Sequence, residues 1–106
     1  MDLAVDCYSA TSDFPTSETY GMTSQIRRSS TSIAANIAEG HGRETTAAFI
    51  QFLRVAQGSL KELETHLIVC RRVGLMHETD AGNLLARADE VGKMLRSMVR
   101  SLQRKS

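Results

Sequence analysis

Residues 49–70 read FIQFLRVAQGSLKELETHLIVC, and apolar side chains recur in this stretch at alternating spacings of four and three residues. The positions are Phe49, Leu53, Ala56, Leu60, Leu63, Leu67 and Cys70. This unbroken heptad pattern predicts a long helix with one buried edge. Because a single helix cannot bury such an edge alone, other helices must cover it.

The rest of the chain supplies three such partners. Residues 84–102 repeat the four–three spacing in a helix expected to start near Glu78 or Thr79. Residues 18–39 place apolar side chains along one stripe. A shorter helix is expected over residues 2–11, with Leu3 and Cys7 facing inward. The later repeat consists of Leu84, Ala88, Val91, Leu95, Met98 and Leu102, and the stripe of Met22, Ile26, Ile33 and Ile37.

The expected helices are separated by residues that commonly begin or end helices. Pro15 disfavours helix at the residue before it. Gly40 fits the left-handed cap after a helix, Thr45 fits an N-cap, and Gly74 fits a second glycine cap onto which Leu75 folds back. The sequence thus predicts an all-α chain, an antiparallel up-and-down four-helix bundle with a short first helix, in one domain over residues 1–106.

Charge and cysteine content narrow the class of protein. The net charge is +1, so overall charge gives no reason to expect a nucleic-acid ligand. Residues 1–26 contain four acids and no base, whereas residues 93–106 contain five bases and no acid. We expect Cys7 and Cys70 to be reduced. With no signal-peptide pattern and no apolar run of membrane-spanning length, the sequence favours a cytoplasmic protein without a membrane partner.

Two strings identify a related family. Residues 25–43 read QIRRSSTSIAANIAEGHGR and residues 58–64 read GSLKELE, with Phe14-Pro15 and Tyr20-Gly21 upstream. This pattern resembles the four-helix-bundle family first noted as open reading frames inside intervening sequences of bacterial 23S ribosomal RNA genes. The accessory variability determinant of diversity-generating retroelements is similar to the same family.

The resemblance implies a bundle that assembles into a ring, usually a homopentamer, without catalytic activity. It also implies, for the retroelement members, binding of nucleic acid and of a reverse transcriptase through basic surfaces. This chain departs from the pattern in three ways. Its first helix starts later and has no tryptophan, Ser29 and Ser30 stand where alanine is more usual, and its charge is near neutral.

A polar stripe lies beside the apolar stripe of residues 18–39. It consists of Gln25, Arg28, Ser32, Asn36 and Glu39. Such residues suit a hydrogen-bonded network at the edge of the core or at a subunit interface, and a ligand groove is the alternative. Gly58 lies opposite the heptad edge, where its lack of a side chain would let another subunit approach. Val55, Val69, Val73, Ile50 and Ile68 add apolar surface beyond the core, which favours self-association.

Basic side chains suggest where nucleic acid would bind. The candidates for phosphate contacts are Arg27, Arg28, Arg43, Lys93, Arg96, Arg100 and Arg104. The last four fall on one helix face, with no aromatic residue among them to stack on bases. A solvated charged face is the alternative interpretation.

No residue pattern predicts an enzyme, a metal or a cofactor. His41, His66 and His77 have no metal-ligand spacing, and the glycines around His41 are not followed by the lysine of a phosphate loop. We therefore expect a non-enzymatic ring-forming oligomer, a scaffold or accessory to an RNA- or DNA-handling system. The alternative is a structural protein–protein interaction module with no nucleic-acid role.

Overall fold

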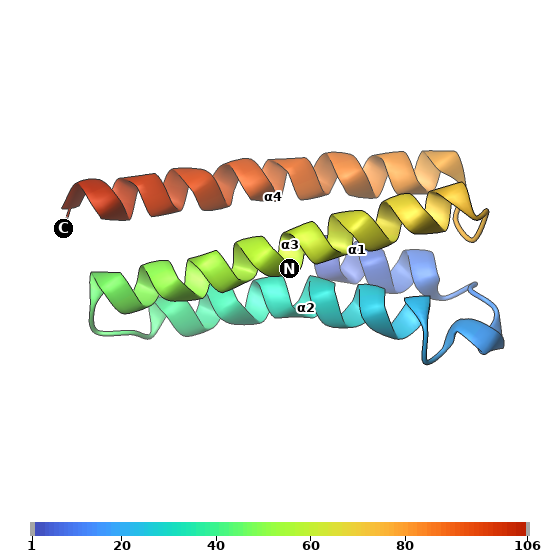
Figure 1. Ribbon diagram of the computed structural model, residues 1–106, viewed down its shortest axis with the longest axis horizontal. Helices are drawn as coiled ribbons and strands as arrows, with labels where there is room; N and C mark the ends of the chain where they lie inside the picture. Colours follow the sequence, from blue (N-terminus) through green and yellow to red (C-terminus); the bar gives the residue numbers. More distant parts are fainter. Residues whose placement is uncertain (1, 106) are drawn as a thin grey trace.

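The computed structural model describes residues 2–105, which form four α-helices and one short 3-10 helix. In chain order these are α1 (Asp2–Thr11), η1 (Thr16–Glu18), α2 (Met22–His41), α3 (Thr46–Arg72) and α4 (Glu78–Lys105). Successive α-helices run in opposite directions along a rod of 47 × 22 × 18 Å (Figure 1). The predicted all-α class, the four-helix arrangement and the short first helix are confirmed.

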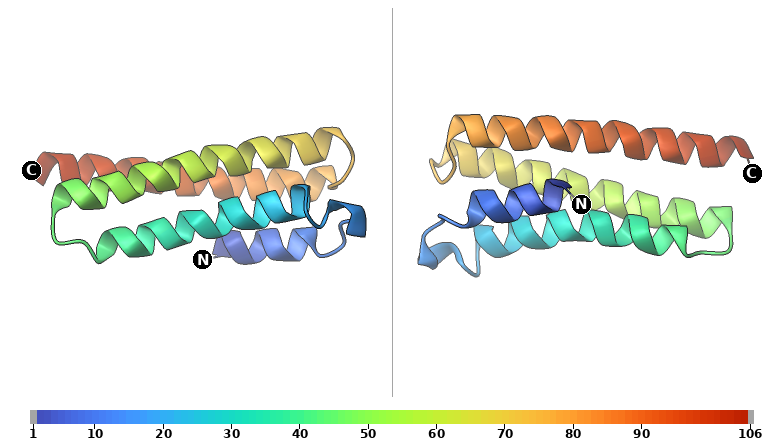
Figure 2. Two further views of the ribbon diagram at one scale, coloured as in Figure 1. Left: turned by 60° about the horizontal axis from the view of Figure 1, so that its bottom comes forward. Right: turned by 180° about the vertical axis from the view of Figure 1, so that it is seen from behind.

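The helices are arranged so that each packs against its neighbours in the chain. α2 lies against α3, α3 lies against α4, and α1 contacts both α2 and α4. Because α1 is much shorter than the others, it covers only the half of the bundle that contains the α3–α4 connection (Figure 2). The other half is built from α2, α3 and α4.

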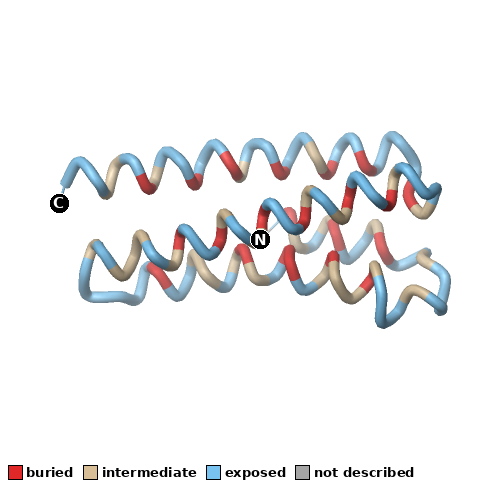
Figure 3. Tube along the Cα trace, viewed as in Figure 1, coloured by how far each residue is buried: buried red, intermediate tan, exposed pale blue. Residues whose placement is uncertain are grey.

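The core follows the heptad pattern of α3. Leu53, Leu63 and Leu67 are fully buried, and six of the seven predicted positions are in the core, with Phe49 half-buried at the edge. The buried residues form a line along the inner side of each helix (Figure 3). The predicted buried edge of α3 is confirmed.

The buried edge of α4 differs in part from its prediction. Leu84, Ala88 and Leu95 are buried, but Val91, Met98 and Leu102 are only half-buried, and Gly92 and Val99 are buried instead. The reason is the short α1, whose first residues reach α4 near Val91 and Met94. Beyond that point α4 packs mainly against α3. The buried positions therefore lie one residue after the predicted ones, at Gly92 in place of Val91 and at Val99 in place of Met98.

The ends of the helices agree with the sequence at two sites and differ at a third. Thr45 is the N-cap of α3, where its hydroxyl accepts from the Ala48 amide at 3.1 Å. Gly74 has φ 81°, and the Leu75 amide donates to the Cys70 carbonyl at 3.0 Å, as in a Schellman motif.

Gly40 does not have the predicted left-handed conformation. It lies inside α2, which continues to His41, and among residues 2–105 only Gly74 has a positive φ. Gly40 is needed for close packing instead, because a Cβ there would lie 2.7 Å from Cδ1 of Phe49 on α3. A glycine at the end of an apolar stripe can either cap the helix or allow close packing with another helix, and the sequence does not distinguish these two roles.

Small polar residues let α1 and α3 approach α2. Ser29 and Ser30 are 3% and 2% exposed. Their hydroxyls donate to backbone carbonyls one turn earlier in α2, at 2.8 Å to Gln25 and 3.0 Å to Arg27. Because these hydrogen bonds stay within α2, the burial costs little and the helices pack closely.

Candidate functional site

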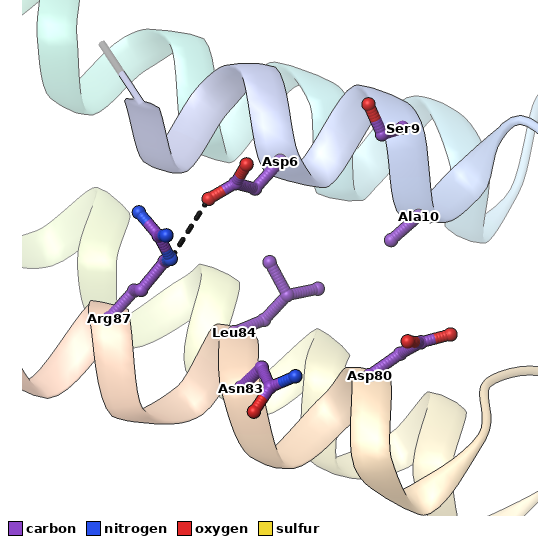
Figure 4. Close-up of a pocket in the computed structure, with 7 residues that line it drawn as sticks. All are labelled: Asp6, Ser9, Ala10, Asp80, Asn83, Leu84 and Arg87. Carbon is purple, nitrogen blue, oxygen red and sulfur yellow. Dashed lines mark ion pairs between the residues drawn. The ribbon is translucent and has the colours of Figure 1, made fainter.

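A hollow with a volume of about 370 Å³ lies between α1 and α4 (Figure 4). Asp6 and Arg87 form an ion pair across it, with 3.0 Å between the carboxylate and Nε. Asp80, Asn83 and Ser9 add polar groups. The side chains that line this hollow beside the Ser9 hydroxyl include neither histidine nor cysteine.

The predicted basic residues lie on several faces. Arg27 faces α1, where Nε donates to the Thr11 hydroxyl at 3.0 Å and the guanidinium lies 4.5 Å from the centre of the Tyr8 ring. These contacts hold α1 on α2. Arg27 therefore has a structural role in this chain.

Three more of the predicted residues have partners close by. Arg28 donates to Gln25 on α2 at 2.7 Å, and Arg43 pairs with Glu39 while lying over the Phe52 ring. Lys93 pairs with Asp89 one turn earlier on α4, at 3.4 Å. The acids beside Arg43 and Lys93 make these two residues weaker candidates for phosphate contacts, whereas the partner of Arg28 is a neutral amide.

The structure brings Arg96 and Arg100 together with an arginine that the sequence analysis missed. These two residues of α4 line a hollow of about 180 Å³ with Arg54 of α3. Arg104 is exposed near the end of α4 and does not line this hollow. The sequence contained a signal for this residue. When a short connection joins two antiparallel helices, residues at equal distances before and after the connection lie side by side. Arg54 then falls level with Met98, between the two arginines.

The predicted polar stripe lies along the outer edge where α2 meets α3. The Ser32 hydroxyl is 2.9 Å from the Ser59 hydroxyl of α3, and the Asn36 side chain donates to the Ser32 carbonyl and hydroxyl at 2.8 and 3.1 Å. The remaining members, Gln25 and Glu39, contact Arg28 and Arg43. Gly58 is exposed, and a Cβ on it would meet nothing within 4 Å.

α3 carries a second heptad series on this same side. We call this series with the polar stripe of α2 the α2–α3 face. Its exposed apolar members are Val55, Val69 and Val73, whose exposed fractions are 46%, 38% and 65%. The whole series, again spaced four and three, is Ala48, Phe52, Val55, Ser59, Glu62, His66, Val69 and Val73. A heptad series is the pattern by which helices pack, so this face has the form of a helix-packing surface.

One polar atom on the α2–α3 face is unsatisfied within the described chain. His66 Nε2 is buried, forms no hydrogen bond in residues 2–105 and lies 4.0 Å from the Glu62 carboxylate. With Ser32 opposite Ser59, antiparallel register puts Gln25 level with His66 and Arg28 near the level of Glu62. Polar groups from two helices therefore gather along one edge.

Both cysteines are in the core. Cys7 and Cys70 are free and completely buried. Burial raises the pKa of each thiol from 9.0 to about 11. Thiols with raised pKa values are poor nucleophiles and poor metal ligands, so these two act as small apolar residues.

Neither a metal site nor a membrane span was found in residues 2–105. No group of three or more His, Cys, Asp or Glu side chains there is placed to hold a metal ion. None of the described helices is both long enough and apolar enough to cross a bilayer.

Comparison with known proteins identifies the family. The pattern of the 23S rRNA-intervening sequence protein family matches residues 1–97. The chain belongs to this family. The resemblance that the strings QIRR and NIAEG carry is therefore confirmed.

A solved structure with a similar sequence has the same fold. It is a crystal structure of a protein with unknown function from the S23 ribosomal protein family of Bacteroides thetaiotaomicron. Its sequence is 28% identical, the match covers 92% of each chain, and the TM-score is 0.83. No curated protein sequence matches the chain.

Proposed function

We propose that this chain is a non-enzymatic scaffold that assembles into a ring of identical subunits and serves an RNA- or DNA-handling system. The α2–α3 face is the observation that carries the proposal. It combines exposed valines, a heptad spacing and a buried polar atom that forms no hydrogen bond in residues 2–105. A second copy that covers this face would bury the apolar side chains and could supply a hydrogen-bond partner for His66.

We propose that the ring has five subunits, because the family that the chain resembles usually forms homopentamers. The subunit contact uses the residues of the polar stripe and the valines beside them. Gly58 leaves room for a side chain or backbone from the neighbouring copy. The proposed interface residues are Gln25, Arg28, Ser32, Asn36, Glu39 and Gly58, with Val55, Val69 and Val73.

Light scattering on the purified full chain tests self-association. One chain has a mass of 11.7 kDa, and we expect the mass of a ring of five such chains. Val55→Glu and Val69→Glu would each place a charge in the proposed contact and reduce the mass to that of one chain. Val5→Glu is the matched control, because Val5 is also an exposed valine but lies on α1. A wild-type mass of one chain at working concentration would refute the ring.

Nucleic acid is the proposed ligand of the assembled ring. Arg96, Arg100 and Arg104 form no ion pair within residues 2–105, so none of them is already paired with an acid there. A ring repeats each set of charges once per subunit, which strengthens the electrostatic field. We expect mixed RNA and DNA oligonucleotides to bind at ~50 mM salt and to dissociate as salt rises. Absence of binding at ~50 mM salt would contradict this part of the proposal.

The second candidate is a structural module that binds protein partners and no nucleic acid. It is favoured by the near-neutral charge and by the local pairing of Arg28, Arg43 and Lys93. A pull-down with and without nuclease separates the two. Partners recruited through nucleic acid disappear on nuclease treatment, whereas partners that bind the chain directly remain.

A further inference from the structure

A groove runs along the outer junction of α3 and α4. Two hollows of about 320 and 180 Å³ form it, and both are lined by Gln57 and Arg96. Small residues of the two helices open the larger hollow. Gly92 is buried against Leu60, since a Cβ on this glycine would lie 3.2 Å from a methyl carbon of the leucine, and Gly58 and Ala88 also line this part.

The two halves of the groove differ in charge. The larger hollow is lined by bases and acids together, namely Lys61, Arg96, Glu64 and Asp89. The smaller hollow is lined by Arg54, Gln57, Arg96, Val99, Arg100 and Gln103, with three positive charges and no acid. We call this smaller hollow the arginine pocket.

None of the three arginines of this pocket forms an ion pair within residues 2–105. Arg54 donates a hydrogen bond to the neutral Gln57 side chain at 3.3 Å. For Arg96 and Arg100 the structure gives no hydrogen bond or ion pair in residues 2–105. Since like charges one helical turn apart destabilise a helix slightly, this arrangement gains nothing for the fold.

Helix register brings the three side chains together. Leu60 of α3 packs against Gly92 of α4, so residues whose numbers add up to about 152 lie at the same level. Arg54 is therefore level with Met98, which lies midway between Arg96 and Arg100. The pocket is therefore lined by arginines of both helices, and the Arg96 guanidinium reaches back toward Gly92, where a Cβ would lie 3.3 Å from it, so that Arg96 stands between the two hollows.

We propose that phosphate groups of a nucleic-acid backbone occupy the arginine pocket and are held by Arg54, Arg96 and Arg100. This inference rests on the proposed nucleic-acid role and specifies where and how the strand binds. Guanidinium groups bind phosphate oxygens through paired hydrogen bonds, so three of them around one small hollow match phosphate chemistry. The pocket lining includes no aromatic side chain on which a base could stack.

Two consequences follow from this lining. Contacts to the backbone position a strand without reading its bases, so binding should depend little on sequence. The arginine pocket also lies on the α4 side of α3, whereas the α2–α3 face lies on its other side. The proposed subunit contact and the arginine pocket therefore share no residue, although Gly58 of that contact also lines the larger hollow of the groove.

Binding of labelled oligonucleotides by the full chain tests the inference. The probes are a 20-nucleotide RNA, a single DNA strand of the same sequence and the corresponding DNA duplex. Fluorescence anisotropy measures the binding of each probe between 50 and 200 mM salt. Arg54→Gln, Arg96→Gln and Arg100→Gln should each weaken binding and reduce the salt slope by about 0.7 to 0.9 for each phosphate that is no longer neutralised. Arg72→Gln is the control, because it removes the same charge from the exposed end of α3.

The outcomes separate the pocket from the wider proposal. Weaker binding in the three variants with no change in Arg72→Gln supports the pocket, and the three probes show whether RNA, single-stranded DNA or duplex is preferred. Equal weakening in all four variants overturns the pocket and leaves a diffuse nucleic-acid role. No binding by the wild type overturns both, while light scattering still reports on the ring. Displacement of the probe by polyglutamate at equal charge would assign the pocket to acidic protein and overturn phosphate recognition.

Discussion

Two glycines inside helices differ in whether close packing requires them. Gly40 is buried where α2 meets α3, and a Cβ would approach Phe49 to 2.7 Å. Gly82 is exposed on α4, and a Cβ there would meet nothing within 4 Å. Glycine costs about 1 kcal/mol relative to alanine inside a helix, so only the first site has a compensating gain in packing.

Alanine substitutions should therefore act in opposite directions. We expect Gly40→Ala to lower the free energy of unfolding by about 1–3 kcal/mol, because Phe49 must shift. Gly82→Ala should raise it by roughly 0.5–1 kcal/mol through helix propensity and a less flexible unfolded chain. Urea unfolding followed by circular dichroism measures both. A stabilised Gly40→Ala variant would show that α2 and α3 pack less closely than the distance to Phe49 indicates.

The two buried thiols predict a loss of stability at high pH. Folding raises the pKa of Cys7 and Cys70 from 9.0 to about 11, mainly because burial disfavours the thiolate. Between these pH values the unfolded chain has lost protons that the folded chain keeps. Stability is thus complete below about pH 9 and falls as the pH approaches 11, by ~2–3 kcal/mol per thiol.

Urea unfolding at pH 7, 9 and 10.5 in reducing buffer measures this loss. The comparison is with a Cys7→Ala/Cys70→Ala double variant, in which other titrating groups are unchanged. We expect the decline in the free energy of unfolding above pH 9 to be smaller in the double variant. If both proteins lose stability equally, the thiols do not contribute to the pH dependence.

At the level of the helix, α3 has a specific signal at each end. The Thr45 hydroxyl binds the Ala48 amide at the first turn, and Gly74 provides the left-handed residue after the last turn. Between these ends, one edge of α3 forms the core and a second edge faces outward with α2. α3 is therefore the element that both the core and the proposed assembly share.

Removal of the N-cap hydroxyl should weaken α3 measurably. We expect Thr45→Ala to lower the free energy of unfolding by about 1 kcal/mol, since the Ala48 amide loses its acceptor. Thr46→Ala is the control, because it removes a neighbouring hydroxyl that does not cap the helix. Chemical denaturation of both variants gives the comparison. A cost for Thr46→Ala as large as that for Thr45→Ala would argue against the cap.

At the level of the whole molecule, the short α1 leaves a bundle that is unequally covered. Four helices surround the core at one end, and three do so at the other (Figure 2). The α2–α3 face and the arginine pocket flank α3 on opposite sides. A chain with surfaces arranged in this way has room for both a neighbouring subunit and a ligand.

Assembly through the α2–α3 face should make thermal stability depend on concentration. We expect Tm to rise with protein concentration in the wild type, because association stabilises the folded state by mass action. Val69→Glu should have a lower Tm that does not change between about 5 and 200 μM. Scanning calorimetry over that range measures both. A wild-type Tm that is constant would indicate that folding and association are not coupled.

The sequence by itself determined the helices and the core. The heptad spacing of α3, the cap at Thr45 and the turn at Gly74 depend on contacts within a few residues, so they could be identified from the order of side chains. Local patterns did not resolve Gly40, whose role depends on how closely Phe49 approaches. They also misplaced part of the buried edge of α4, which depends on how far along α4 the first residues of α1 reach.

The tertiary structure alone decided which distant residues meet. Arg54 joins Arg96 and Arg100 only because α3 and α4 are antiparallel with Leu60 against Gly92. Arg27, by contrast, is held by Tyr8 and Thr11 of α1. The physical reason is range: backbone hydrogen bonds and apolar periodicity act along the chain, whereas a charged pocket depends on register and rotation between helices, which side-chain packing sets.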